Sequence, residues 1–167
     1  MTRELYWQFP RAENQPFELR AEGKGVGWLH FDDAFGARAV GELDGSRWIF
    51  DYHCAAHPHV SIVAAGSKAT VAEFVPRVTG GGTVTFTSGA SYCWNRARIW
   101  SPQWCFRREG YPSICLTQQA GPLVEGGTVQ VCQEAAQRPE TAILVLLAWY
   151  LRVLAFETLV EAIPAVG

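Results

Sequence analysis

The sequence has no excess of charge of either sign. Its 167 residues include 14 Lys and Arg against 16 Asp and Glu, which gives a formal net charge of -2 and a sequence pI near 6.1. A chain with this balance has no global attraction to nucleic acid, so we expect no nucleic-acid partner. Binding to an anionic membrane would depend on a local basic patch.

The sequence also lacks the common catalytic motifs. No serine lies in a Gly-x-Ser-x-Gly elbow, and Gly80-Gly81-Gly82 is not followed by the Gly-Lys-Ser or Gly-Lys-Thr ending of a phosphate-binding loop. No carboxylate pair can be recognised from the spacing of the acidic residues. We therefore expect a protein that is not an enzyme, with no catalytic residue and no cofactor.

The five cysteines are odd in number, scattered, and never in a C-x-x-C arrangement. Four of them fall in segments of alternating apolar residues, where a free thiol behaves as a small core hydrophobe. The pattern predicts reduced cysteines and a reducing compartment. The first residues lack the basic and then apolar organisation of a secretory signal, so we expect a cytoplasmic protein, peripheral at the membrane if it binds lipid. The cysteines are Cys54, Cys93, Cys105, Cys115 and Cys132.

Most of the chain consists of short runs of β-branched and aromatic residues that end in turn residues. This pattern predicts about twelve strands between residues 4 and 133. Connections such as Asp44-Gly45 are short enough for hairpins, so neighbouring strands should pair antiparallel. Pairs such as Trp48 and Phe50 place two large rings on one face of a strand, as core residues do. No linker divides the chain, and one domain over 1-167 is expected.

The last segment changes from strand to helix. Pro139 and Glu140 are typical of a helix start, and a helix over about 139-163 is predicted, ended by Pro164. Residues 142-151 carry no charge and cover every face of the helix, so apolar material must surround it. The apolar part is about 22 Å long, short of the ~30 Å core of a bilayer, and Arg152 would lie inside, so no integral membrane span is expected.

The interior of a β-barrel is the environment that fits this helix best. A wall of tilted strands of about seven residues is roughly 18 Å tall, close to the length of the apolar stretch. Eight strands fill a barrel with side chains and sixteen leave a channel, so about twelve leave room for one helix. The sequence predicts a mainly β fold: a closed antiparallel β-barrel of about twelve strands that encloses its hydrophobic C-terminal α-helix.

This pattern resembles the tubby-like fold, which tubby C-terminal domains, LURP-one-related proteins and phospholipid scramblases share. The resemblance runs from the strand at Leu5-Tyr6-Trp7 to the helix at residues 143-151. It implies a non-catalytic barrel domain that binds phospholipid or phosphoinositide headgroups through Lys and Arg side chains, or that scaffolds protein partners. The headgroup candidates are Lys68, Arg77, Arg96 and Arg98. The alternative is that these are ordinary solvated charges.

Two other functions stay open at this point. His53, His57 and His59 lie close in sequence with Cys54 beside them, and they could form a metal site in a metal-binding protein or metalloenzyme. The alternative is a polar hairpin connection in which Pro58 fixes the turn. A lipocalin-like carrier of small molecules would need an empty barrel and an amphipathic helix packed outside it.

Overall fold

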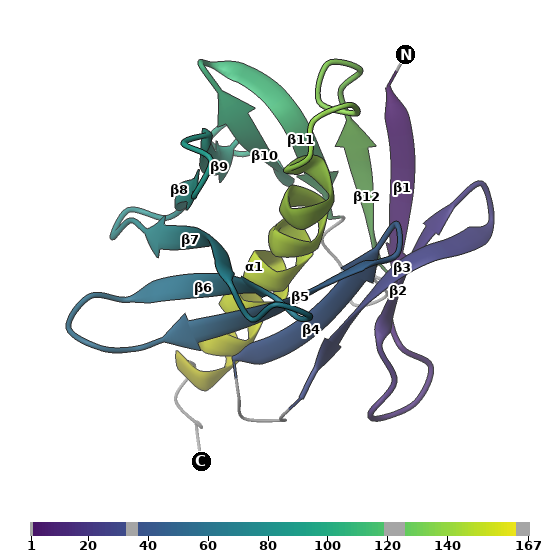
Figure 1. Ribbon diagram of the computed structural model, residues 1–167, viewed down its shortest axis with the longest axis horizontal. Coiled ribbons are helices and arrows are strands. Elements are labelled where there is room, and N and C mark those ends of the chain that lie inside the picture. The colour runs from purple at the N-terminus through teal and green to yellow at the C-terminus, as the bar shows by residue number, and fades with distance from the viewer. Residues whose placement is uncertain (1, 33–36, 119–125, 163–167) are drawn as a thin grey trace.

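The structure is a computed structural model that describes residues 2-32, 37-118 and 126-162, with side chains as far as residue 154 in the final helix. This part of the chain forms a ring of strands around one helix (Figure 1). The elements are β1 Arg3–Gln8, β2 Phe17–Ala21, β3 Lys24–Phe31, β4 Arg38–Leu43, β5 Ser46–His53, β6 His59–Ala64, β7 Thr70–Pro76, β8 Gly82–Phe86, β9 Ser91–Arg96, β10 Gln103–Arg108, β11 Tyr111–Thr117, β12 Gly126–Val131 and α1 Thr141–Ala162.

The strands close into a barrel. Each strand pairs antiparallel with the next along the chain, and β1 pairs with β12 from Arg3↔Val131 to Gln8↔Gly126. Register shifts within the β2–β3, β6–β7 and β10–β11 pairs mark bulges, which bend a sheet as closure requires. The predicted closed antiparallel barrel is confirmed.

The up-and-down order sends alternate connections to opposite ends of the barrel. Connections that follow odd-numbered strands, such as 54-58, 77-81 and 97-102, lie at the end where α1 finishes, which we call the exit end. The opposite end, where α1 begins, is the entry end. At this end Asp44-Gly45 and Glu109-Gly110 form two-residue turns. The φ angles are 52° at Asp44, 79° at Gly45, 52° at Glu109 and 83° at Gly110, and a type I′ hairpin turn requires positive φ at both of its residues.

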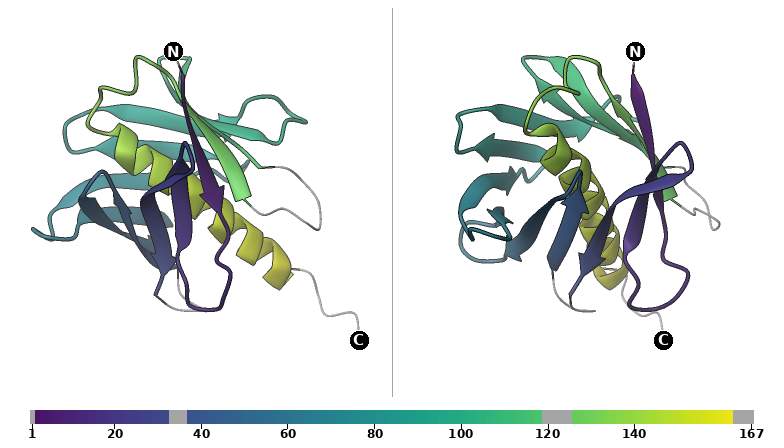
Figure 2. Two further views of the ribbon diagram at one scale, coloured as in Figure 1. Left: turned by 90° about the vertical axis from the view of Figure 1, so that its right-hand side faces the viewer. Right: turned by 45° about the vertical axis from the view of Figure 1, so that its right-hand side comes forward.

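The apolar part of α1 is buried on every side. All residues from Ile143 to Tyr150 are at most 6% exposed, and Figure 2 shows the helix running through the ring of strands. Trp149 stacks on Trp7 of β1 with 5.5 Å between ring centroids. Tyr150 stacks against aromatic rings of β3 and β5, and its hydroxyl donates to the carbonyl of Ala37. The prediction that the helix is enclosed by the sheet is confirmed.

The helix lies closer to some strands than to others. A Cβ on Gly41 of β4 would lie 3.1 Å from Leu146, and one on Gly127 of β12 would lie 2.9 Å from Trp149, so these glycines allow a close approach. Elsewhere the interior is filled by large buried rings on β7, β8 and β9. These are Phe74, Phe86, Tyr92 and Trp94. Side-chain size therefore compensates for the off-centre position of the helix.

The helix starts two residues later than predicted. Thr141 is its first residue, and Glu140 precedes it with a carbonyl that accepts the amide of Leu144 at 3.0 Å. Pro139 and Glu140 belong to a turn, which is held by hydrogen bonds from the backbone amide and hydroxyl of Thr141 to carbonyls of the 132-140 connection. The helix ends at Ala162, and the predicted last residue, 163, lies outside the described part of the chain. Among the described residues no helix is long and apolar enough to cross a membrane.

The prediction that all the cysteines are reduced is wrong for two of them. Cys105 of β10 and Cys115 of β11 form a disulfide. They are direct cross-strand partners with Cα atoms 4.1 Å apart, a pairing that follows from the register and not from any sequence motif. The bond removes the cysteine-based argument for a reducing compartment. Cys54, Cys93 and Cys132 are free.

Shortening a central side chain of α1 should destabilise the barrel strongly. Leu146 is fully buried, so Leu146→Ala should lower the free energy of unfolding by about 2–5 kcal/mol through lost contacts and a cavity. Val78→Ala, at a fully exposed position, should change it by less than about 0.5 kcal/mol. Urea denaturation of both variants measures the difference, and equal midpoints would contradict the enclosed helix.

The disulfide predicts the number of reactive thiols. The denatured protein, kept from reductants, should titrate as the three free cysteines, and reduction should expose two more. Thiol titration with an aromatic disulfide reagent, combined with the intact mass before and after reduction, measures both states. Five thiols in the unreduced protein would show that Cys105 and Cys115 are not bonded.

Candidate functional site

The structure separates the four predicted headgroup residues. Arg77 lies in the β7–β8 connection, Arg96 ends β9 and Arg98 lies in the β9–β10 connection, and all three are at the exit end. Lys68 lies in the β6–β7 connection at the entry end. The order of the strands predicts this separation, because in a meander the connections after odd-numbered strands and those after even-numbered strands lie at opposite ends.

A cluster of two arginines and two tryptophans lies at the exit end. Trp94 of β9 stacks on Trp104 of β10 with 5.5 Å between ring centroids. Arg96 is the cross-strand partner of Trp104, and its guanidinium carbon lies 5.4 Å from the centre of that ring. The guanidinium carbon of Arg152, from α1, also lies 5.4 Å from it. We call Arg96, Trp104 and Arg152 the arginine–tryptophan site.

Arg152 is the member that sequence reasoning missed. In the sequence Arg152 is the first charged residue after ten apolar helical residues, and its charge is evidence only against a membrane span. In the barrel the same position carries the side chain to the exit end, where α1 leaves the interior. An arginine that ends a fully buried helical stretch is the signal that could have identified it.

No carboxylate neutralises the site within the described part of the chain. The ion pairs there are Arg20–Glu18, Arg38–Asp32 and Arg47–Glu42. None of them involves Arg77, Arg96, Arg98 or Arg152. The sequence from 74 to 108 contains no Asp or Glu. Two like charges therefore share one indole without a described counter-charge.

The environment of Arg152 disfavours its positive charge. Burial lowers the pKa of Arg152, and the nearby charge of Arg96 lowers it further. Its Nε atom is buried and has no hydrogen-bond partner among the described residues. A buried donor without an acceptor costs free energy, and a nearby anion would offset the repulsion between the two guanidinium groups.

Another arginine of the same chain shows the neutralised arrangement. The guanidinium of Arg47 lies 5.1 Å from the ring centre of Trp28 and also donates to Glu42 at 2.8 Å. Arg47 therefore has both a ring and a carboxylate. The arginine–tryptophan site has the ring and a second cation instead.

Hydrogen bonds shape the connection that follows Arg96. The Nη1 atom of Arg96 donates to the carbonyl of Ile99 at 3.2 Å, and the amide of Ser101 donates to the carbonyl of Arg98 at 3.0 Å. This fixed turn leaves Ile99 77% exposed and Trp100 93% exposed. The loop therefore presents two large apolar side chains beside the arginines.

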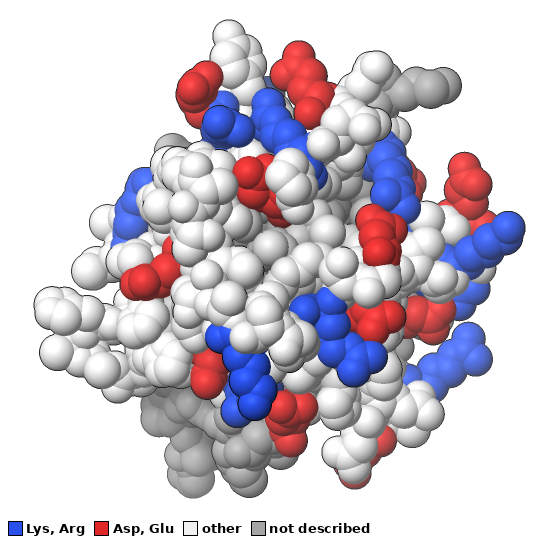
Figure 3. Space-filling view, viewed as in Figure 1, with Lys and Arg blue, Asp and Glu red and all other residues white. Residues whose placement is uncertain are grey.

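The face drawn in Figure 3 carries Lys and Arg side chains interspersed with Asp and Glu, and it shows no broad area of one sign. This mixture agrees with the small net charge of the chain. On the face drawn, no basic area extends beyond a few neighbouring side chains.

The histidine loop does not assemble three metal ligands. The rings of His53 and His59 stack with centroids 4.7 Å apart, and His53 Nε2 forms a hydrogen bond with Ser61 Oγ at 3.0 Å. His59 Nδ1 donates to the carbonyl of His57 at 2.9 Å, which involves the backbone of His57 and not its ring. Within residues 2-32, 37-118 and 126-162 no group of three metal-ligating side chains occurs.

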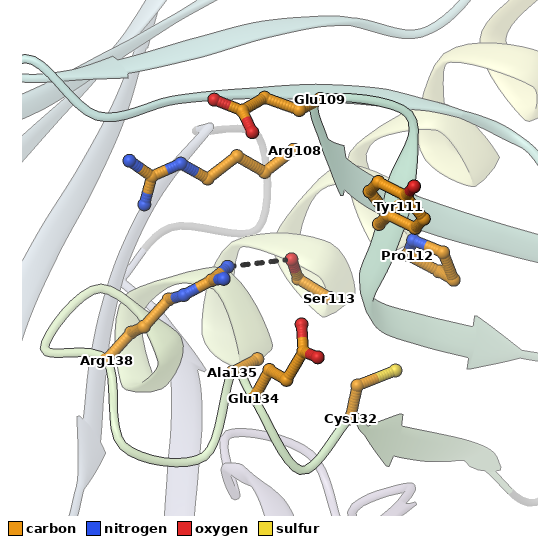
Figure 4. Close-up of a pocket in the computed structure, with 9 residues that line it drawn as sticks. All are labelled: Arg108, Glu109, Tyr111, Pro112, Ser113, Cys132, Glu134, Ala135 and Arg138. Carbon is orange, nitrogen blue, oxygen red and sulfur yellow. Dashed lines mark hydrogen bonds between the residues drawn. The ribbon is translucent and has the colours of Figure 1, made fainter.

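A pocket of about 430 Å³ opens at the entry end, between the β10–β11 turn and the 132-138 connection (Figure 4). Arg138 donates to the buried hydroxyl of Ser113 at 3.4 Å. Arg108 lines the same pocket, but so do Glu109 and Glu134, so its charges are mixed. The pocket contains none of the site residues that the sequence predicted. The interior of the barrel, which a lipocalin-like carrier would keep empty, is filled by the helix and its buried aromatic neighbours.

Replacing Arg152 by an apolar residue of similar length should stabilise the protein. Arg152→Met removes a partly buried charge that Arg96 repels, and we expect the free energy of unfolding to rise. Arg47→Met, which removes an exposed ion pair, should lower it by at most about 1 kcal/mol. Chemical denaturation in phosphate-free buffer measures both changes. A destabilised Arg152→Met would mean that the ring contact outweighs the repulsion.

Comparisons with protein-family models, with curated proteins and with solved structures found no match to this chain. The tubby-like resemblance therefore stays a prediction, and the fold is known from the structure alone.

Proposed function

We propose that this protein binds the headgroups of anionic phospholipids at the exit end of its barrel, with Arg96 and Arg152 as the phosphate ligands. One observation carries the proposal: two guanidinium groups lie on the same indole without a carboxylate among the described residues. The protein acts as a binding domain that attaches to membrane surfaces.

A phosphate group suits the chemistry of the site. Guanidinium groups bind phosphate oxygens through paired, charge-assisted hydrogen bonds, which are stronger than neutral ones. Phosphate would place a negative charge beside both guanidinium groups and would screen Arg152 from Arg96. The free energy that the two cations cost in the free protein is then recovered on binding.

The neighbouring arginines extend the site electrostatically. Arg98 lies two residues after Arg96, in the β9–β10 connection, and Arg77 lies in the adjacent β7–β8 connection. Each basic residue near an anionic bilayer contributes about 1 kcal/mol of attraction, which salt weakens. Lys68 is at the other end and contributes nothing to this surface. The site therefore differs from the predicted one by the loss of Lys68 and the addition of Arg152.

Vesicle co-sedimentation tests the proposal. The protein should sediment with phosphoinositide-containing vesicles and not with neutral phosphatidylcholine vesicles. Arg96→Gln and Arg152→Gln should each weaken binding about tenfold or more, since a charge-assisted hydrogen bond contributes about 1.5–3 kcal/mol. The matched control is Arg47→Gln, which removes an arginine from another indole and should change binding less than about twofold.

Two results would contradict the proposal. One is equal sedimentation of the wild-type protein with neutral and phosphoinositide-containing vesicles. The other is an equal loss for all three variants, because this would reflect general charge instead of the arginine–tryptophan site. Circular dichroism of each variant checks that the barrel is folded.

A further inference from the structure

Two neighbouring loops at the exit end repeat one local pattern, an arginine followed by exposed apolar side chains. In the β7–β8 connection Arg77 precedes Val78, which is fully exposed. In the β9–β10 connection Arg98 precedes Ile99 and Trp100, which are 77% and 93% exposed. Among the described residues, these three are the most exposed large hydrophobic side chains.

The two loops lie side by side on the barrel rim. Residues 77-81 form a turn closed by hydrogen bonds between Arg77 and Gly81 and between Arg77 and Gly80. Gly81, with φ of 74°, lies so close to β9 that a Cβ atom there would be 2.1 Å from the carbonyl oxygen of Trp94. The turn is therefore packed against the strand that leads directly into the second loop.

The apolar side chains are held away from the barrel by hydrogen bonds of the loop backbone. Arg96 donates to the carbonyl of Ile99, the amide of Ser101 closes a turn on Arg98, and the amide of Ala97 donates to Gln103 at 2.9 Å. Pro102 follows, with a fixed φ. A loop with this many internal bonds presents Ile99 and Trp100 outward in one defined conformation.

The arginines lie behind the apolar tips. Arg77 donates to Thr83 at 3.4 Å and to the sulfur of Cys93 at 3.5 Å, both on the strands of the wall. Arg96 lies against Trp104 at the end of the barrel. Apolar side chains in front and cations behind match the order of a bilayer surface, where phosphates lie outside the acyl chains.

We infer that Val78, Ile99 and Trp100 insert below the headgroups of an anionic bilayer, so that the barrel docks with its exit end against the membrane. This inference rests on the proposed function, because the arginines that bind the phosphates determine how deeply the loops enter the bilayer. Tryptophan suits the boundary between headgroups and acyl chains, since its ring is apolar and its N–H is polar.

Charge decides between a bilayer and a second copy of this chain as the occupant. The two loops that carry the apolar tips, 77-81 and 97-102, contain Arg77 and Arg98 and no Asp or Glu, so two copies that met through these loops would bring like charges together. An anionic bilayer offers the opposite charge and an apolar layer at the required depth. The membrane is the occupant to which the charges and the apolar tips both correspond.

Fluorescence quenching by brominated acyl chains tests insertion. The chain has seven tryptophans, so the measurement compares variants in phosphoinositide-containing vesicles with and without brominated lipid. The wild-type protein should be quenched by brominated lipid. Trp100→Phe should bind the vesicles as well as the wild-type protein and should lose most of the quenching. The control Trp28→Phe, on β3, should be quenched as strongly as the wild-type protein.

A second variant measures the contribution to affinity. Ile99→Ala combined with Trp100→Ala should weaken vesicle binding about tenfold or more, because two exposed apolar side chains no longer enter the bilayer. Both positions are exposed, so the variant should unfold at the wild-type urea midpoint. The alanine pair isolates the apolar contribution, because every arginine is retained.

The outcomes separate this inference from the proposed function. Vesicle binding by the wild-type protein without quenching through Trp100 overturns insertion and leaves headgroup binding standing. No binding to phosphoinositide-containing vesicles overturns both. Dimerisation of the wild-type protein in solution that Trp100→Ala abolishes would assign the tips to a second copy and overturn membrane insertion.

Discussion

The burial of one helix with no polar face is the constraint on which the rest of this structure depends. Residues 143-150 need apolar contacts in all directions, and a closed ring of strands provides them without lipid. Closure also removes the free strand edges that an open sheet would expose. The small residues Gly41 and Gly127 and the large rings of β7 to β9 then adjust the ring to a helix that is not central. Barrel and helix are therefore one core.

The filled interior leaves the rim of the barrel as the place where we propose a binding site. A barrel that encloses a helix has no room for an internal ligand of the kind that carriers hold, so charged and apolar side chains at the ends of the strands become the available surface. The helix contributes to that surface directly. Its fixed position carries Arg152 out of the core to the end of β9, where Arg96 already lies on Trp104. The same element that stabilises the fold thus completes the candidate site.

Among the described residues, one arginine on an indole has a carboxylate partner, whereas the two arginines that share Trp104 have none. Arg47 on Trp28 has Glu42 as its counter-charge, which is the arrangement expected of a stabilising surface contact. Arg96 and Arg152 instead lie on one ring; burial lowers the pKa of Arg152, and the charge of Arg96 lowers it further. Two like charges held on one ring are the basis on which we propose that an anion binds there. The adjacent loops add apolar tips, and the two features together correspond to an anionic membrane surface.

The sequence by itself determined the features that depend on local periodicity. Alternating residues and turn signals predicted about twelve antiparallel strands, and ten uncharged helical residues predicted an enclosed helix; both are confirmed. Tertiary structure alone decided which distant residues meet. Strand register bonded Cys105 to Cys115, the alternation of connections separated Lys68 from the three arginines, and the rotation and depth of the helix placed Arg152 beside Arg96. The physical reason is that a repeat along the chain fixes the face on which a side chain lies, whereas closure of the barrel fixes its neighbours.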